Sequence, residues 1–306
     1  MSHLPNRVSR TVDDHLTAIE REYDIAVVLA VARGSHAWGA ASPDSDYDVG
    51  FVSAPTDLRR YAHLETVPGT VVEDRGEFEY QGWDVRTFAR LLADSNEGAI
   101  DLLRSPIRYR TAYDPAALAD YLERTYNPID LYHTWRGIAT SNYRTYISHH
   151  LVRTDDEIFP IIDADEDTYT VETDDGTTTV PSDDERFSET QTKPTVKRNL
   201  TIYRAAMFAY YLVETGERGA HELPALEFET FLTEHAPAVF DADRIDRARE
   251  LLERKRAGEG ATEIGDAVGR EFAHPPKTID PDTHARDGPD IDRLDGFIDD
   301  LLAAVQ

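Results

Sequence analysis

The chain has 306 residues, 40% of them hydrophobic, and it contains no cysteine. It can form one large domain or two of ordinary size, and the lack of cysteine excludes disulfides, zinc–thiolate sites and thiol nucleophiles. Its 59 acidic and 32 basic residues, only four of them lysine, give a net charge of −27. This composition is typical of salt-adapted proteins from halophiles, whose acidic surfaces stay hydrated.

No apolar stretch of about 18 residues is present, so we expect no membrane span. The first ten residues lack the apolar core of a secretory signal, which favours a cytoplasmic protein. A surface this acidic repels phosphates at low salt, although a local basic groove can still bind nucleic acid when salt screens the repulsion.

The first 112 residues predict an α/β domain. The continuous apolar run at 25–32 is typical of a buried central strand. Further strands are expected at 46–52, 67–73 and 78–86, and helices at 8–23, at 88–92 and after the capping residue Asn96.

Residues 113–306 predict a helical domain. Helices are expected at 114–126, 129–151, 195–214, 226–234, 244–256 and 291–305. An acidic insertion at 154–190 interrupts this pattern, and Asp175-Gly176 within it predicts a small exposed hairpin. The expected class is therefore α+β, with a short mixed sheet covered by helices on one face, followed by the helical domain.

The run from Val27 to Val52 carries the most specific pattern, VVLAVARGSHAWGAASPDSDYDVGFV. Gly34 and Ser35 end the apolar strand, and Asp46 and Asp48 open the next one. Asp-x-Asp alone has no weight in so acidic a chain, but carboxylates two positions apart on a strand project to the same side.

Each part of this pattern suits a metal–nucleotide site. Gly34 lets the backbone approach a phosphate, and the Ser35 hydroxyl can donate to it. Asp46 and Asp48 offer the hard oxygen ligands that Mg²⁺ prefers. A third carboxylate is expected on a nearby strand, where Asp84 is our first candidate and Glu77 and Glu79 are weaker alternatives.

Later helices offer further candidates. Lys197 and Arg204 recur at helical spacing in a chain that otherwise avoids lysine, which favours phosphate binding; pairing with surface acids is the alternative. Arg136 and Tyr143 are candidate substrate contacts that could guide a nucleic-acid strand, or they pack and pair within the helical domain.

The Gly-Ser, spacer and Asp-x-Asp pattern resembles the DNA polymerase β-type nucleotidyltransferase superfamily. Four blocks resemble, in order, the RNA-repair-pathway DNA polymerase β family: GSHAWGAASPDSDYD, GWDVRTFARLLADSNEGAIDLLRSP, LYHTWRGIATSNYRTYI and VKRNLTIYRAAMFAYYL. This resemblance implies a minimal nucleotidyltransferase fold, Gly34 and Ser35 at the phosphates, and Asp46, Asp48 and Asp84 as metal ligands. His36 departs from the pattern, because a basic residue is common at that position in the family.

The resulting hypothesis is a nucleotidyltransferase that uses Mg²⁺ or Mn²⁺. It would move a nucleoside monophosphate from an NTP, with ATP among the candidates, to a hydroxyl acceptor such as an RNA end, and release pyrophosphate. Two alternatives remain open: adenylylation of a protein or small molecule by the same chemistry, and a non-catalytic nucleotide-binding regulator.

Overall fold

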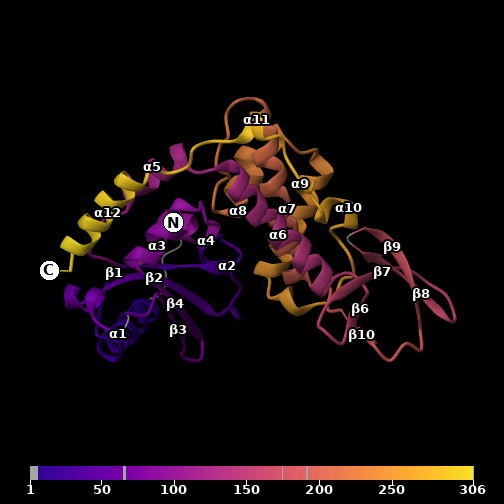
Figure 1. The fold of residues 1–306 in the computed structure, drawn as a ribbon, viewed down its shortest axis with the longest axis horizontal. Helices are drawn as coiled ribbons and strands as arrows, with labels where there is room; N and C mark the ends of the chain where they lie inside the picture. Colours follow the sequence, from indigo (N-terminus) through magenta and orange to yellow (C-terminus); the bar gives the residue numbers. More distant parts are fainter. Residues whose placement is uncertain (1–5, 65–66, 174, 191, 306) are drawn as a thin grey trace. The chain divides into compact units, whose positions relative to one another are not determined.

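The computed structural model describes residues 6–64, 67–173, 175–190 and 192–305 (Figure 1). The chain forms two compact units, each made of separate stretches of sequence. Unit 1 comprises 1–134, 211–240 and 279–306, and unit 2 comprises 135–210 and 241–278. The expected boundary at residue 112 is therefore not where the units divide, because α6 (Pro128–Tyr146) and α7 (Val196–Glu217) each begin in one unit and end in the other.

Unit 1 is built on a five-stranded sheet with the order β3-β4-β2-β1-β5. Its strands are β1 (Ile25–Ala32), β2 (Tyr47–Pro55), β3 (Thr70–Asp74), β4 (Phe78–Asp84) and β5 (Arg108–Thr111). β2 and β4 pair in parallel, and the other neighbours pair antiparallel. The sheet is therefore mixed, as expected, and with its helices it agrees with an α+β class.

Helices cover both faces of this sheet, not one face as the sequence predicts (Figure 1). On one face, α1 (Asn6–Tyr23) buries Val12, Leu16 and Ile19 in a core with Val49 and Phe51 of β2. α3 (Val85–Ala93) and α4 (Glu97–Arg104) lie on the opposite face. On that face α4 packs closely on the sheet, because a Cβ atom added to Gly50 of β2 would lie only 3.2 Å from Leu102 Cδ1 of α4.

The rest of unit 1 consists of short helices and parts of the two long ones. These elements are α2 (Gly34–Ala37), η1 (Leu58–Ala62), α5 (Ala116–Thr125), the first part of α6, the end of α7, α8 (Phe228–Thr230), η2 (Phe231–His235), η3 (Ala236–Ala238), α11 (Pro281–His284) and α12 (Ile291–Ala303). η2 is a π-helical segment. As expected, Asn96 caps α4, because its Oδ1 accepts from the Ala99 amide at 3.2 Å.

Unit 2 contains a second sheet where the sequence predicts an insertion with one hairpin. Its strand order is β10-β6-β7-β8-β9, with β6 (His150–Arg153), β7 (Ile158–Ala164), β8 (Thr168–Thr173), β9 (Gly176–Pro181) and β10 (Phe187–Thr190). The expected hairpin is the β8–β9 pair. Leu151, Phe159, Val171 and Val180 form a core of their own, so the segment is a folded sheet in which β6 to β9 form a meander and β10 returns to pair with β6.

The helices of unit 2 are most of α6 and α7, together with α9 (Ala242–Arg256), η4 (Glu259–Ala261) and α10 (Arg270–Ala273). None of the helices in the described ranges combines the length and the apolar character needed to cross a membrane.

Candidate functional site

The turn after β1 brings Gly34 directly against Asp48. Gly34 has a φ of +55°, and a Cβ built on it would lie 1.9 Å from Asp48 Oδ2. The Arg33 amide donates to the Asp48 carbonyl at 2.7 Å, which fixes the turn to the start of β2. Only glycine fits this position, because any side chain would displace the carboxylate and strain the backbone.

Asp48 and Glu79 lie side by side on neighbouring parallel strands. They are register partners in the β2–β4 pairing, and such partners project from the same face of a sheet. Asp46 precedes β2 by one residue and shares the parity of Asp48, but its side chain is exposed. Two carboxylates from different strands therefore meet beside the Gly34 turn.

A cavity of about 490 Å³ opens beside Gly34, Asp48 and Glu79, a region of unit 1 that we call the Gly34 corner. Its lining residues are Arg33, Gly34, Asp48, Val49, Val72, Glu73, Asp74, Glu79, Tyr80 and Gln81. The lining combines four carboxylates with the one guanidinium of Arg33. A volume of this size falls within the ~300–1,000 Å³ range of small-molecule sites.

Arg33 is a candidate that the sequence analysis missed. Its guanidinium donates to Gln81 Oε1 and lies 5.1 Å from the centre of the Trp83 ring. These contacts hold the cation at the cavity wall, next to Gly34. The available signal was a positive charge at the end of a run of eight apolar residues, directly before the Gly-Ser turn.

Asp84, our first candidate for the third carboxylate, is not part of this corner. It is the register partner of Ser53, five residues farther along the strands than the Asp48–Glu79 pair, which places it roughly 16 Å away at ~3.3 Å per residue. Its carboxylate is buried and caps α3: it accepts from the Arg86 amide at 3.1 Å and from the Tyr61 hydroxyl at 2.6 Å. The structure therefore does not bring Asp84 together with Asp48, and the carboxylate that it places beside Asp48 is Glu79.

Ser35 and His36 follow Gly34 in α2, a helix of only four residues. Neither is among the residues that line the cavity. The His36 ring stacks on Tyr47 with 4.6 Å between ring centres, and Tyr47 stacks on Phe78 at 5.0 Å. His36 therefore packs in an aromatic column.

The cations predicted on α7 belong to unit 2. Lys197 is exposed, and its carbonyl accepts from the Thr201 hydroxyl at 2.9 Å. The Arg204 guanidinium lies 4.5 Å from the centre of the Phe208 ring. A role for these two residues at the Gly34 corner stays a prediction.

The two candidate substrate contacts on α6 have partners within unit 2. Arg136 Nε donates to the Pro275 carbonyl at 2.9 Å. Tyr143 is buried and donates to Asp266 Oδ2 at 2.7 Å; burial, followed by this bond and the Asp266 charge, raises its pKa. These contacts agree with the packing alternative for both residues.

In the ranges that the structure describes, no three Asp, Glu, His or Cys side chains are grouped closely enough to hold a metal ion by themselves. The donor chemistry of the corner nevertheless suits Mg²⁺, which is usually bound by one or two carboxylates together with substrate phosphates and water. Asp48 and Glu79 supply two such carboxylates on one face, with Asp46 two residues away.

Comparison with known proteins agrees with the resemblance seen in the sequence. The family model described as "RNA repair pathway DNA polymerase beta family" matches residues 8–300. Over 148 residues the chain is 30% identical to a Bacillus subtilis (strain 168) protein, "Uncharacterized protein YcgL". That alignment covers 48% of this chain and 56% of the relative, so the chain spans about half the length of the curated relative it matches.

Proposed function

The chain belongs to the RNA repair pathway DNA polymerase beta family, and from that membership we propose that it is a metal-dependent nucleotidyltransferase. It transfers a nucleoside monophosphate from an NTP to a hydroxyl, releases pyrophosphate, and takes an RNA end as the acceptor. The family name supports the reaction class. The acceptor and the nucleotide are parts of the proposal.

The observation that carries the proposal is the contact between Gly34 and Asp48, with Glu79 in register beside it. A glycine turn against paired carboxylates gives phosphate oxygens an approach to the backbone at the point where a divalent cation would be held. Asp48 and Glu79, joined by Asp46 at the start of β2, are the proposed ligands of Mg²⁺ or Mn²⁺. When bound, the ion would neutralise phosphate charge and lower the pKa of the acceptor hydroxyl.

The protein groups have separate roles in this reaction. Arg33 binds the triphosphate from the cavity wall, where its contacts with Gln81 and Trp83 hold the guanidinium in place before the substrate arrives. The acceptor oxygen forms a bond to the α-phosphorus, the bond to the bridging oxygen breaks, and pyrophosphate leaves. The acceptor's proton passes to the Glu79 carboxylate. The main contribution of the protein is positioning, which is the main requirement of phosphoryl-transfer chemistry.

The test is incubation of the protein with each α-labelled NTP, Mg²⁺ or Mn²⁺, and a pool of RNA, followed by detection of labelled acceptor and pyrophosphate. We expect Asp48→Asn to abolish transfer while the protein stays folded. The matched control is Asp44→Asn, which removes an exposed carboxylate from the same connection between β1 and β2. Equal activity in both variants refutes the assignment, and label found on protein in place of RNA identifies adenylylation as the activity.

A further inference from the structure

Two helices of unit 2 differ in charge from the rest of the chain. Acidic residues occupy 59 of 306 positions, yet residues 131–154, which include most of α6, and residues 190–213, which include most of α7, contain none. Burial does not account for this, because both ranges have exposed positions: His133, Ser141, Thr145, His149, Lys193 and Lys197. A chain that otherwise places acids on its surface leaves these two helices without negative charge.

Three cations of unit 2 lie where the chain enters α7. They are Lys193, Lys197 and Arg198, and we call them the α7 basic cluster. Both lysines are exposed, and the half-buried Arg198 has its guanidinium 3.6 Å from the centre of the Tyr146 ring of α6. Among the residues that the structure describes, no carboxylate forms an ion pair with any of the three. Lys197 is therefore not neutralised by a surface acid.

The lack of acidic partners is local to this cluster. Elsewhere in unit 2 an exposed arginine such as Arg247 pairs with Glu250. The acids closest to the cluster along paired segments are Glu189, which accepts from the Tyr169 hydroxyl at 3.2 Å, and Glu263, which lies across an isolated β-bridge from the start of α7. Neither of them forms an ion pair with the cluster, so its positive charge stays unbalanced within the described chain.

The position of the cluster also opposes the helix dipole of α7. This helix has 22 residues and no acid in its first turn, whereas α4, α6 and α9 each have one there. The N-terminus of a helix favours negative charge, so cations at this point lower the stability of the helix, and a bound anion would remove that cost. A position that breaks a local rule of stability without compensation is expected at a functional site.

The backbone that carries the cluster is fixed in place. The Val196 amide donates to the Thr262 carbonyl at 2.9 Å. Thr195 Oγ1 accepts from the Arg198 amide at 3.3 Å and so caps the first turn of α7. Binding of an anion therefore has to order the lysine side chains but not the chain that holds them.

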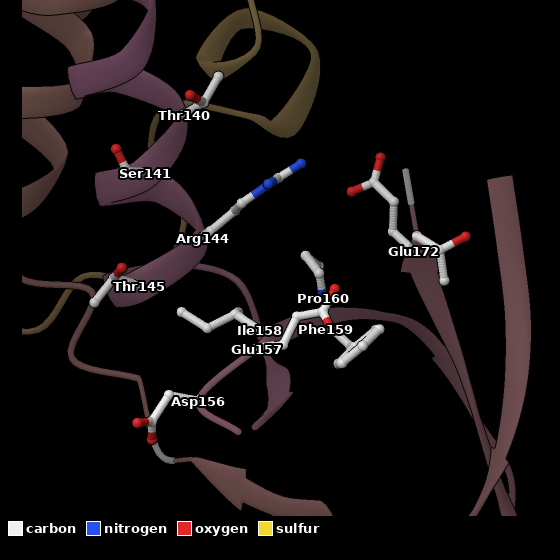
Figure 2. A pocket seen from close by; sticks show the side chains of 11 residues that line it. Thr140, Ser141, Arg144, Thr145, Asp156, Glu157, Ile158, Phe159, Pro160 and Glu172 are labelled. Carbon is white, nitrogen blue, oxygen red and sulfur yellow. The ribbon is translucent and has the colours of Figure 1, made fainter. Parts of the chain in front are cut away.

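The cavity beside α6 is a poor alternative for an anion. It has a volume of about 410 Å³, and Asp156, Glu157 and Glu172 line it together with one cation, Arg144 (Figure 2). The α7 basic cluster is not part of that lining. Exposed cations outside a cavity suit an extended polyanion, which gains affinity from many phosphate contacts, better than a small molecule, which needs enclosure.

A nucleic acid fits the cluster better than a membrane does. Binding to a lipid surface requires large apolar side chains next to the cations. The exposed large hydrophobic residues of the described ranges are Leu64, Val72, Ile162 and Ile291, and none of them lies within 190–213.

We propose that the α7 basic cluster binds the phosphate backbone of a single RNA strand, with Lys193, Lys197 and Arg198 facing phosphate oxygens. The proposal deepens the proposed function and rests on it for the choice of RNA as the nucleic acid. Contacts with the backbone position a strand without reading its bases, so binding at this surface does not depend on sequence.

The test is fluorescence anisotropy of a short labelled single-stranded RNA at several KCl concentrations, in EDTA and without NTP, with circular dichroism to establish that each protein is folded. We expect the double variant Lys193→Gln/Lys197→Gln to bind about tenfold more weakly or worse at ~0.1 M salt. The slope of log affinity against log salt should fall by about 0.7 for each of the two lost phosphate contacts.

The matched control is the double variant Arg247→Gln/Lys277→Gln. It removes the same charge from unit 2 at two exposed residues outside the cluster. We expect it to leave the affinity and the salt slope nearly unchanged. Equal affinities and slopes in the two double variants overturn the proposal, as does a wild-type protein that binds no RNA at any salt concentration at which it is folded.

Vesicles of phosphatidylcholine and phosphatidylserine are the second probe. Vesicle binding that depends on Lys193 and Lys197, together with RNA binding that does not, assigns the surface to a membrane and overturns the proposal. Because the RNA measurement contains no metal and no NTP, lysine-dependent RNA binding supports the surface even if the protein transfers nothing. Transfer to RNA with lysine-independent binding refutes the surface and leaves the proposed reaction intact.

Discussion

Replacing Gly34 with alanine tests whether the close approach of Gly34 to the Asp48 carboxylate is needed for the proposed reaction. The added Cβ would lie 1.9 Å from Asp48 Oδ2 and 2.8 Å from its Cγ, so the carboxylate must move by more than 1 Å to reach ordinary contact. The φ of +55° adds a backbone cost of about 1–2 kcal/mol for a residue with a Cβ. We expect Gly34→Ala to lose about 1–2 kcal/mol of unfolding free energy from the backbone alone.

The effect on transfer is expected to be larger than the effect on stability. A displacement of about 1 Å in a catalytic group commonly costs about 100-fold in rate, so transfer should fall at least that far. The assays are pyrophosphate release under saturating NTP and Mn²⁺ affinity by calorimetry, each compared with denaturant unfolding.

Gly76→Ala is the matched control for this experiment. Gly76 has a φ of +78°, so alanine at this position should lose a similar amount of unfolding free energy from the backbone. Nothing lies within 4 Å of the added Cβ atom. We expect this variant to lose stability and keep its activity. Equal retention of activity and Mn²⁺ affinity in both variants would show that Asp48 does not act at this corner.

Three further predictions follow from the same structure. Glu79→Gln should reduce transfer and Mn²⁺ affinity at least tenfold, whereas Glu77→Gln, on an exposed residue beside the same strand, should change neither. Asp84→Asn should lower the free energy of unfolding by about 1–3 kcal/mol, because it weakens a buried helix cap that has Tyr61 and Arg86 as side-chain partners. The same variant should leave Mn²⁺ affinity unchanged, and weaker Mn²⁺ binding would argue for Asp84 as a ligand. Burial, with Arg286 and His284 nearby, lowers the pKa of His221 below 6.5 in the folded protein. As pH falls, this histidine is therefore protonated in the unfolded chain at a higher pH than in the folded protein. The free energy of unfolding should therefore decline as pH falls through 6.5. Denaturant unfolding at several pH values checks this, and the decline should be smaller in the His221→Gln variant.

Local patterns in the sequence predicted the elements of unit 1 well. The apolar run at 25–32 is β1, and Gly34 and Asp48 meet as the Gly-Ser and Asp-x-Asp pattern indicates. Each of these inferences depends on residues close together in the chain, where periodicity and turn chemistry carry most of the information.

The third carboxylate could not be chosen from local pattern, because the choice depends on register between strands. Glu79 and Asp84 lie on the same strand, and only the pairing of β4 with β2 determines which of them stands beside Asp48. Strand register is set by the packing of whole faces and is not visible in a short motif.

The division into units and the second sheet escaped prediction for similar reasons. α6 and α7 each contribute to both units, so no composition change marks a boundary. In the acidic segment, only the Asp175-Gly176 turn gave a local signal, and the other strands are rich in Thr, Asp and Glu without clear alternation.

The most direct test of the Gly34 corner is a crystal structure with Mn²⁺ and a non-hydrolysable NTP analogue. We predict anomalous density for manganese between Asp48 and Glu79, with the triphosphate against Gly34 and Arg33. Manganese at Asp84, or a nucleotide bound away from the β1–β2 turn, would contradict the account.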